Sequence, residues 1–390
     1  MSAGVACLIL AYVLSQFYRA CLAVLAPILT ADLGATASDL ANASGLWFLT
    51  FGAMQLPVGW ALDRFGPRRL ASVVLALGGG GGAALFAMAT TPAAVLWAMA
   101  LIGVGCSPVL MSSYYIFART LKPALFGTMA SLVLGIGTLG NVASATPLAM
   151  TVEALGWRGA LWGLAAVTLA TALLLALLVR DPVRLRSTEK GSVLSLLAMP
   201  ALWPVFLMMA VCYMPVAALR GFWLGPYYAD VFGAGPAEIG NAALIMGLAM
   251  VLGTFAFGPL ERRLRTRKWL ILGANLVVAL AILGLWAFGA QGGWLTLALF
   301  AAVGFFGTSF PMVIAHGRAF VPEHLTGRGV TLLNLFGIAS VGIAQVLTGR
   351  LHAAIAPIPP EAAYQAIFLA IALVTLAGCA VYAFSRDRTD

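Results

Sequence analysis

Charged residues are what this sequence has least of. Asp, Glu, Lys and Arg make up 9% of its 390 residues, whereas 62% of the residues are hydrophobic. A water-soluble chain of this length needs far more charge to cover its surface. The composition therefore excludes that class and predicts an all-α, polytopic integral membrane protein.

Cysteine and histidine are also scarce, with five and three residues respectively. All five cysteines fall inside apolar stretches, so no disulfide framework is indicated. The sequence also lacks a Ser/His/Asp, Cys/His or paired-carboxylate constellation of the kind that catalysis requires. We therefore expect a protein that is not an enzyme and that has no cofactor and no resident metal.

Long apolar runs dominate instead. A helix needs about 20 such residues, at 1.5 Å each, to cross a bilayer core of about 30 Å. The windows that meet this requirement are 4–29, 41–62, 70–90, 93–117, 126–151, 159–179, 201–227, 240–260, 269–289, 294–317, 329–349 and 362–384. We expect twelve transmembrane helices.

The basic residues follow these windows in a regular way. Of the 22 Lys and Arg, all but Arg19, Arg158, Arg220 and Arg350 lie in one set of alternating loops and in the C-terminal tail. Cytoplasmic loops of membrane proteins carry such an excess, so both termini are expected in the cytoplasm. The net charge of +9 then reflects topology, and no nucleic-acid partner is expected.

The windows form two sets of six with a related pattern. A polar segment at 181–200 separates an N-terminal half, residues 1–180, from a C-terminal half, residues 201–390. DLGATASDLANA after the first window resembles DVFGAGPAEIGNA after the seventh, and Gly59 matches Gly258 at the same offset. Such repeats predict two pseudo-symmetric six-helix bundles, with a substrate site at their interface that opens alternately to each side.

The segment QLPVGWALDRFGPRRL, residues 55–70, joins the second and third windows. It resembles the signature loop of the major facilitator superfamily, G-x-x-x-D-R-x-G-R-[RK], and a degenerate copy, GPLERRLRTRK, follows the eighth window. The resemblance covers the whole chain and implies the fold of that family, with the loop's acid clamping the cytoplasmic helix ends. The residues expected to form this gate are Gly59, Asp63, Arg64, Gly66, Arg68 and Arg69, with Gly258, Glu261 and Arg262 in the second copy.

Arg19 and Arg220 are the only charged residues inside the twelve windows, which contain no Asp or Glu. An arginine at this depth costs roughly 3 kcal/mol and usually faces a cavity or a partner. The two lie at near-equivalent places in the first and seventh windows, and their planar donors suit carboxylate or phosphate. They predict an anion site. The side chains expected to line it are Tyr12, Gln16, Tyr213, Trp223, Tyr227, Asn334 and Gln345.

Three alternatives stay open. Both arginines would snorkel to water if they lie toward the helix ends. The pairs Met246/Met250 and Met312/His316 have the helical spacing of soft copper ligands, as a copper importer would need. A proton-coupled drug or metabolite exporter is the third, and His316 is the candidate proton-coupling residue because it is the one histidine at membrane depth.

The resemblance extends to the organic-anion and organophosphate branches of the superfamily, which place an arginine in helix 1 and, among glycerol-phosphate-type antiporters, in helix 7. The sequence therefore predicts a monomeric secondary transporter in the inner membrane of a bacterium. It would move a small anionic metabolite by alternating access, with a co-transported or exchanged ion left open. Symport and antiport both fit, because the windows hold no carboxylate that would fix proton coupling.

Overall fold

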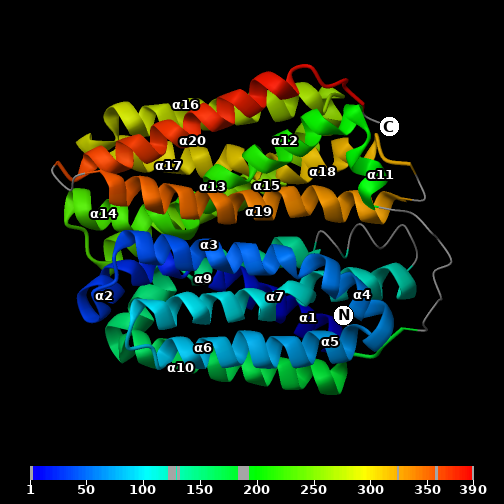
Figure 1. Cartoon of the computed structure of the whole chain (residues 1–390), viewed down its shortest axis with the longest axis horizontal. Coiled ribbons are helices and arrows are strands. Elements are labelled where there is room, and N and C mark those ends of the chain that lie inside the picture. The colour runs from blue at the N-terminus through cyan, green and yellow to red at the C-terminus, as the bar shows by residue number, and fades with distance from the viewer. Residues whose placement is uncertain are drawn as a thin grey trace. The chain divides into compact units, whose positions relative to one another are not determined.

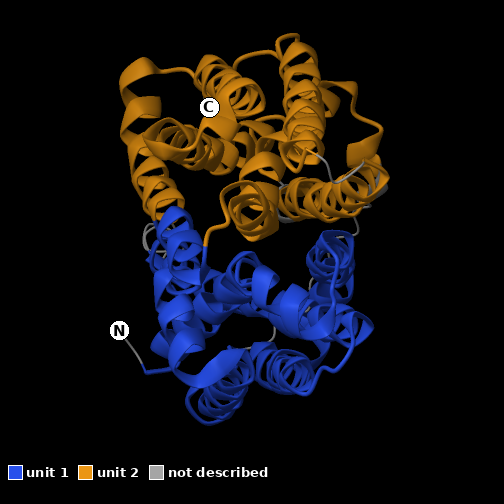
Figure 2. Ribbon diagram, turned by 90° about the vertical axis from the view of Figure 1, so that its left-hand side faces the viewer, with its two compact units in different colours: residues 1–186, 235–244 blue, residues 187–234, 245–390 orange. Residues whose placement is uncertain are grey.

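The computed structural model describes residues 3–121, 129, 132–182, 193–322, 325–355 and 359–388. Every regular element in these residues is a helix (Figure 1), which confirms the all-α class. The chain divides into two compact units, unit 1 with residues 1–186 and 235–244 and unit 2 with the remainder (Figure 2). The boundaries predicted at 180 and 201 stay a prediction, and residues 183–192 of that linker lie outside the described residues.

The helices of unit 1 follow the first six windows. They are α1 (Ala3–Tyr18), α2 (Leu22–Leu33), α3 (Ala37–Ala53), α4 (Gln55–Phe65), α5 (Pro67–Val74), the π-helix η1 (Leu75–Gly80), α6 (Gly81–Ala87), α7 (Pro92–Thr120), α9 (Leu139–Ala143) and α10 (Thr146–Leu178). The first residues of α15 (Pro236–Leu264) also belong to this unit.

Unit 2 contains the rest of α15 and the remaining helices. They are α11 (Val193–Leu197), η2 (Pro200–Leu202), α12 (Trp203–Cys212), α13 (Met214–Ala218), the π-helix η3 (Leu219–Trp223), α14 (Leu224–Phe232), α16 (Lys268–Phe288), η4 (Gly289–Gln291), α17 (Gly293–Phe306), η5 (Gly307–Ser309), α18 (Phe310–Arg318), α19 (Thr326–Ala354) and α20 (Glu361–Tyr382).

The described residues hold nine helices that are long and apolar enough to cross a membrane, and two bent pairs raise that number to eleven. The pairs are α1 with α2, bent by 49°, and α3 with α4, bent by 44°. α10 contains Gly156 at φ 71° and ψ 162°, so it joins two helices, 146–155 and 157–178. Each of the twelve predicted windows is therefore helical, the one at 126–151 only where the structure describes it.

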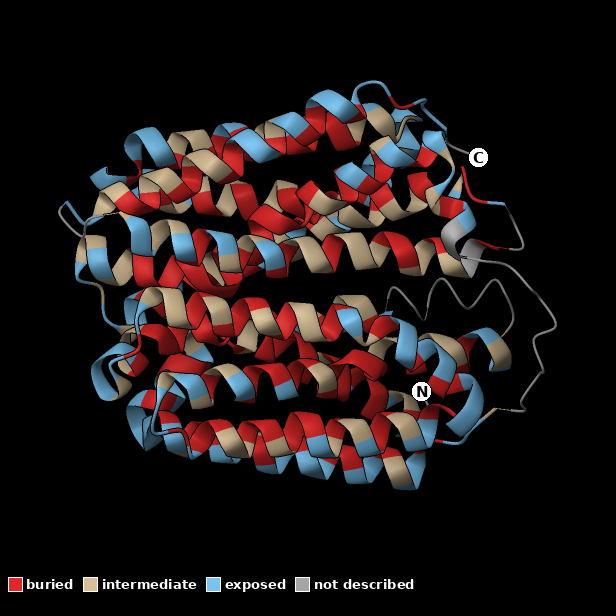
Figure 3. Ribbon diagram, in the orientation of Figure 1, coloured by how far each residue is buried: buried red, intermediate tan, exposed pale blue. Residues whose placement is uncertain are grey.

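Exposed residues lie along the outer faces of these helices (Figure 3), and many of them are large and apolar. Trp97 is 63% exposed, Leu173 60% and Leu280 63%. A soluble protein rarely leaves so much apolar surface in water, whereas lipid tails solvate it without cost. The surface therefore fits a membrane-embedded chain.

Glycines let helices of unit 1 approach closely. A Cβ added at Gly105 of α7 would lie 2.0 Å from the backbone nitrogen of Gly79 in η1. A Cβ at Gly140 of α9 would lie 2.0 Å from the carbonyl oxygen of Val13 in α1. Within a bilayer such contacts supply the van der Waals packing that holds helices together. The glycine-rich sequence of these spans is therefore structural.

Candidate functional site

Arg19 lies where the first membrane span breaks. Residues 19–21 form a turn between α1 and α2. The side chain of Arg19 is only 9% exposed, and its Cζ atom lies 5.0 Å from the ring centre of Trp47 and 5.5 Å from that of Phe51, both in α3. Aromatic faces attract a guanidinium most strongly when water is excluded. The structure thus holds the buried charge at a helix break against an aromatic wall.

Two further predicted residues lie one and two turns before Arg19 on α1. The Gln16 amide donates a hydrogen bond to the Tyr12 hydroxyl at 3.1 Å, and both side chains are buried. The Tyr12 ring packs on the backbone of Gly137, where a Cβ would lie 2.2 Å from it. The Oε1 atom of Gln16 is buried without a hydrogen-bond partner among the described residues. This oxygen atom could therefore accept a hydrogen bond from a ligand.

Trp47 was not among the predicted site residues. Its side chain is fully buried, it stacks on Phe51 with the ring planes 17° apart, and its indole Nε1–H has no acceptor in the described part of the chain. A buried indole N–H usually finds a partner. This residue could not be predicted from the sequence, because nothing in α3 indicates which of its faces contacts Arg19.

Arg220 lies in the π-helix η3, and its side chain is 1% exposed. A Cβ added at Gly247 of α15 would lie 3.8 Å from its Nε atom, so the guanidinium packs on that glycine. The Gln345 amide of α19 donates to the carbonyl oxygen of Ala218 at 3.1 Å, just before η3, and its Oε1 atom is buried with no partner found in the described residues. π-Helical turns are frequent at functional sites, and this one carries the only charge of its window.

The aromatic residues predicted to share this face pack within unit 2. The Trp223 indole donates to the Thr348 hydroxyl at 2.9 Å. The ring of Tyr227 lies 5.3 Å from that of Tyr364 and 5.1 Å from that of Phe368. Both side chains are buried in this cluster. They brace the segment that carries Arg220, and nothing in these contacts aims them at a ligand.

The two remaining predicted residues lie elsewhere in unit 2. Tyr213 is at the junction of α12 and α13, with its ring 4.9 Å from that of Phe310, and it is 8% exposed. Asn334 is half-buried on α19. Among the predicted residues of this unit, Gln345 is the one bonded to the backbone that leads into η3.

The loop between the second and third spans turns sharply at Gly66. Its φ of 84° and ψ of 156° lie in a region that is essentially restricted to glycine, and Pro67 then begins α5. The Arg68 backbone N–H donates to Oδ1 of Asp181 at 2.8 Å, and its Nε donates to the carbonyl oxygen of Ala176 at 2.6 Å. Asp181 therefore caps α5 from just beyond the end of α10.

The predicted gate residues of this loop have separate contacts. The Asp63 carboxylate pairs with Arg119 at the end of α7, with 3.6 Å between the charged atoms. Arg64 lies 5.3 Å from the ring centre of Trp60, Arg69 is exposed, and a Cβ added at Gly59 would meet nothing within 4 Å. Asp63 thus ties the loop to a neighbouring helix of its own unit.

The degenerate copy in unit 2 is held differently. Glu261 pairs with Arg267 at 2.7 Å within the loop, Arg262 is exposed, and Gly258 has open space beside it. Arg265 has a positive φ of 51°. Asp387 of the C-terminal tail accepts hydrogen bonds here, from the Thr266 hydroxyl and from the backbone N–H groups of Arg267 and Lys268.

The charge of Asp387 is stabilised by these bonds. Burial alone would raise the pKa of its carboxyl group, but the hydrogen bonds from Thr266, Lys268 and Arg267 outweigh it and hold the pKa below its ordinary value. Sequence reasoning missed both Asp181 and Asp387. The dipeptide Arg-Asp at 180–181 recurs at 386–387, at the end of each half, and it was the available clue.

His316 of α18 is buried and bonded at both ring nitrogens. The Tyr382 hydroxyl lies 2.6 Å from Nδ1, and the carbonyl oxygen of Arg386 lies 2.9 Å from Nε2. A carbonyl only accepts, so Nε2 carries a proton, and a neutral imidazole with Nδ1 accepting from Tyr382 satisfies both contacts. His316 therefore fastens the C-terminal tail to α18 and α20, and its role in proton coupling stays a prediction.

Comparison with known proteins adds a family and a fold. The family model described as Major Facilitator Superfamily matches residues 8–225 and 206–390. A probable sulfoacetate transporter, SauU of Cupriavidus necator, is 28% identical over 181 residues, which are 46% of this chain and 41% of that protein. The chain is thus aligned with less than half of this relative.

Solved structures resemble the whole chain at low sequence identity. A D-xylose–proton symporter superposes with a TM-score of 0.79 at 15% identity, over 98% of both chains. A bacterial homologue of the human lysosomal transporter Spinster, inward-facing and occupied, has a TM-score of 0.74 at 16% identity, over 97% of this chain and 95% of that one. At such identities these likenesses concern the fold alone.

Proposed function

The chain belongs to the Major Facilitator Superfamily, and from that premise we propose that it carries a small organic anion across the inner membrane of a bacterium by alternating access. That it is a multi-pass membrane transporter and not an enzyme follows from the family. The anionic nature of the substrate and the location are the parts proposed here.

One observation carries the proposal. The two charged residues of the twelve windows are both buried, and each lies where its helix departs from regular α geometry: Arg19 at the break after α1 and Arg220 in η3. Binding sites of secondary transporters are typically built from such discontinuous helices. Snorkelling to water is disfavoured as an explanation, because neither side chain is more than 9% exposed.

The local chemistry suits an anion with planar, multiple acceptors. A guanidinium presents parallel N–H donors that match a carboxylate, phosphate or sulfonate, and it is less strongly hydrated than an ammonium. The aromatic wall of Trp47 and Phe51 keeps Arg19 in place and excludes water. The N–H of Trp47 and the Oε1 of Gln16, which have no hydrogen-bond partner among the described residues, would supply a further donor to the substrate and an acceptor for a hydroxyl or protonated group.

The curated relative supports the same substrate class. Its printed description is a probable sulfoacetate transporter, and sulfoacetate carries two anionic groups. We therefore propose small organic acids as substrates and sulfoacetate as the first to test. Copper and apolar cations should be tested alongside these acids, because a copper importer would bind the first and a drug exporter the second.

The remaining parts of the proposal concern the cycle. Both termini lie in the cytoplasm, and Asp63 with Arg119 and Glu261 with Arg267 hold the cytoplasmic loops of the two units. The transporter works as a monomer. Exchange of one anion for another, or entry of a substrate with its own proton, requires no carboxylate inside the windows.

The test is ligand-induced stabilisation of the detergent-purified protein, followed by uptake into proteoliposomes. A ligand at 100 times its Kd adds roughly 2.7 kcal/mol to the stability, which a thermal melt detects. We expect one anion class to stabilise the wild type, and Arg19→Ala and Arg220→Lys each to abolish that shift and the uptake. Arg220→Lys keeps the charge and removes the paired donors.

Arg350→Lys is the matched control, because Arg350 is exposed and lies outside the windows. It should behave as wild type in both assays. If the arginine variants fold and transport normally, the anion site is wrong. If only copper or apolar cations shift the melt and Arg19→Ala responds equally, one of the competing interpretations replaces it.

A further inference from the structure

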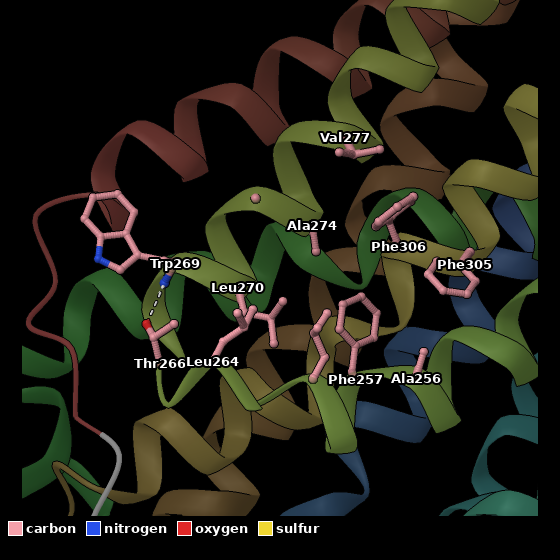
Figure 4. A pocket seen from close by; sticks show the side chains of 12 residues that line it. Ala256, Phe257, Leu264, Thr266, Trp269, Leu270, Ala274, Val277, Phe305 and Phe306 are labelled. Carbon is pink, nitrogen blue, oxygen red and sulfur yellow. Dashed lines mark hydrogen bonds between the residues drawn. The ribbon is translucent and has the colours of Figure 1, made fainter. Parts of the chain in front are cut away.

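An apolar groove opens on unit 2, and Arg220 is not among the residues that line it. Its volume is about 370 Å³ (Figure 4). The residues that line it come from α15, α16, α17 and the loop between the first two: Ala256, Phe257, Leu260, Leu264, Thr266, Trp269, Leu270, Gly273, Ala274, Val277, Phe305 and Phe306. Thr266 is the one hydroxyl-bearing residue among them, so the groove suits a hydrocarbon and not a polar metabolite.

One end of the groove lies at the loop that joins α15 to α16. Thr266 and Trp269 mark this end in Figure 4, and Phe305 and Phe306 lie at the other. Trp269 is 61% exposed and Leu264 52%. Tryptophan is enriched where hydrocarbon meets the headgroups, which places this end at the membrane surface and the phenylalanines deeper. The groove therefore runs from the membrane surface into the hydrocarbon region, as the acyl chain of a lipid does.

The loop at the surface end carries an excess of positive charge. Glu261 is paired with Arg267, and the Asp387 carboxylate is bonded to Thr266 and to backbone N–H groups. Within the part of the chain that the structure describes, no ion pair is found for Arg262, Arg263, Arg265 or Lys268. Lys268 lies over the Trp269 ring at 4.9 Å, beside the groove.

We propose that this groove is a binding site for one anionic phospholipid of the surrounding membrane. An acyl chain occupies the groove, and the phosphate and its anionic headgroup bind the cations of the loop at residues 262–268. Basic pockets between helices on the cytoplasmic side are suited to such headgroups. The combination of an apolar groove with a basic loop at one of its ends, where Lys268 lies over Trp269, favours a phospholipid over a soluble anion, which would gain nothing from the groove.

The test counts lipids retained by delipidated, detergent-purified protein in native mass spectrometry. Phosphatidylglycerol and phosphatidylcholine with identical acyl chains are added in turn. We expect wild type to bind one phosphatidylglycerol about tenfold more tightly than phosphatidylcholine, which is about 1.4 kcal/mol. Equal binding of the two lipids would mean an ordinary boundary layer and would overturn the proposal.

Gly273→Phe fills the groove, because a Cβ at Gly273 meets nothing within 4 Å and the ring has room to enter. It should remove the bound lipid. Gly163→Phe is the matched control: Gly163 is also exposed and uncrowded, but it lies in unit 1. Val277→Phe fills the same groove from a second position, should Gly273→Phe fail to fold. Unchanged binding in the groove variants contradicts the proposal.

The charge at the mouth is tested separately. Arg263→Gln combined with Lys268→Gln should abolish the preference for phosphatidylglycerol and leave weak binding of both lipids. Arg350→Gln removes a charge from the last part of α19 and should keep the preference. A preference that survives the double substitution would show that the basic loop does not recognise the headgroup, and it would refute this part.

Discussion

The segment at residues 55–70 and its copy at residues 254–269 connect their helices by different turns: Gly66 alone separates α4 from α5, whereas residues 265–267 lie between α15 and α16. In the first, Gly66 takes a backbone conformation that glycine alone adopts easily; at the matching place the second has Arg265, with φ at 51°. In both, a carboxylate from the end of the same half caps the helix that follows: Asp181 bonds the backbone of Arg68, and Asp387 that of Arg267.

The two loops therefore share the capping carboxylate and not the glycine. Asp387 makes more hydrogen bonds than Asp181, so the second loop tolerates a strained arginine at its turn. The first loop leaves no such freedom, since a Cβ at Gly66 would lie 2.9 Å from the Asp181 carboxylate. A degenerate sequence signature therefore need not mean a lost structure.

Exchanging the turn residues Gly66 and Arg265 should give the largest change in the free energy of unfolding. Gly66→Arg adds backbone strain and displaces Asp181, and we expect a loss of roughly 2–4 kcal/mol in the free energy of unfolding. Arg265→Gly relieves strain and should gain about 1 kcal/mol. Thermal melts of the detergent-purified variants measure both. Equal and small effects at the two positions would show that the turns are equivalent after all.

Removing the caps comes next in size. Asp181→Ala and Asp387→Ala each expose helix N–H groups, at a cost of about 0.5–2 kcal/mol. The loss should be larger for Asp387→Ala, because three hydrogen bonds are broken there. Asp39→Ala is a useful reference, since Asp39 makes a comparable capping box with Thr36 at the start of α3. A larger loss at Asp181 would reverse our ordering.

The charge of the second cap predicts a pH dependence. The pKa of Asp387 is lowered in the folded protein, so its stabilising effect is fully present above the pKa of the unfolded chain, about 3.9, and is lost as the pH falls through the lower folded value. The melting difference between wild type and Asp387→Asn should thus be constant near neutrality and shrink below about pH 4. A difference that grows on acidification contradicts this assignment.

The smallest effect is expected at the ion pair that only the first loop makes with a neighbouring helix. Arg119→Ala should cost less than about 1 kcal/mol, because Asp63 is 62% exposed and salt screens such pairs. Arg318 is the matching residue at the end of α18 and is exposed, so Arg318→Ala should cost nothing measurable. Thermal melts at low and high salt distinguish the two variants, since only the difference between wild type and Arg119→Ala should shrink as salt is added.

Much of the fold could be predicted from the sequence, because long apolar runs have one outcome in a bilayer. The twelve windows are helical, and the ends expected near 151 and 159 meet at Gly156. The bends could not be predicted: the turn after Tyr18 and the junction at Met54 both lie inside windows that hydropathy marks as continuous spans. Helix breaks there depend on packing partners that hydropathy does not reveal.

The charged residues of the candidate site could be predicted from the sequence, but the side chains that surround them could not. Arg19 and Arg220 stood out because buried cations are costly in lipid, and both are buried. Trp223 and Tyr227 share a helical face with Arg220, yet their rings pack in an aromatic cluster. Trp47 and Asp181 were missed because each acts on a residue far away in the chain. Helical spacing reports which side chains share a face, and it is silent about what that face meets.

The position of Asp181 also bears on how the gene could be divided. Its bond to Arg68 joins the chain just after α10 to the start of α5, so a fragment of the N-terminal half keeps this contact only if it includes Asp181. A split transporter, expressed from two open reading frames, should therefore be cut after residue 182 and not at the last apolar residue of the span. A first fragment that ends at residue 179 would lack Asp181 and therefore the hydrogen bond to Arg68, whether or not the second fragment is present.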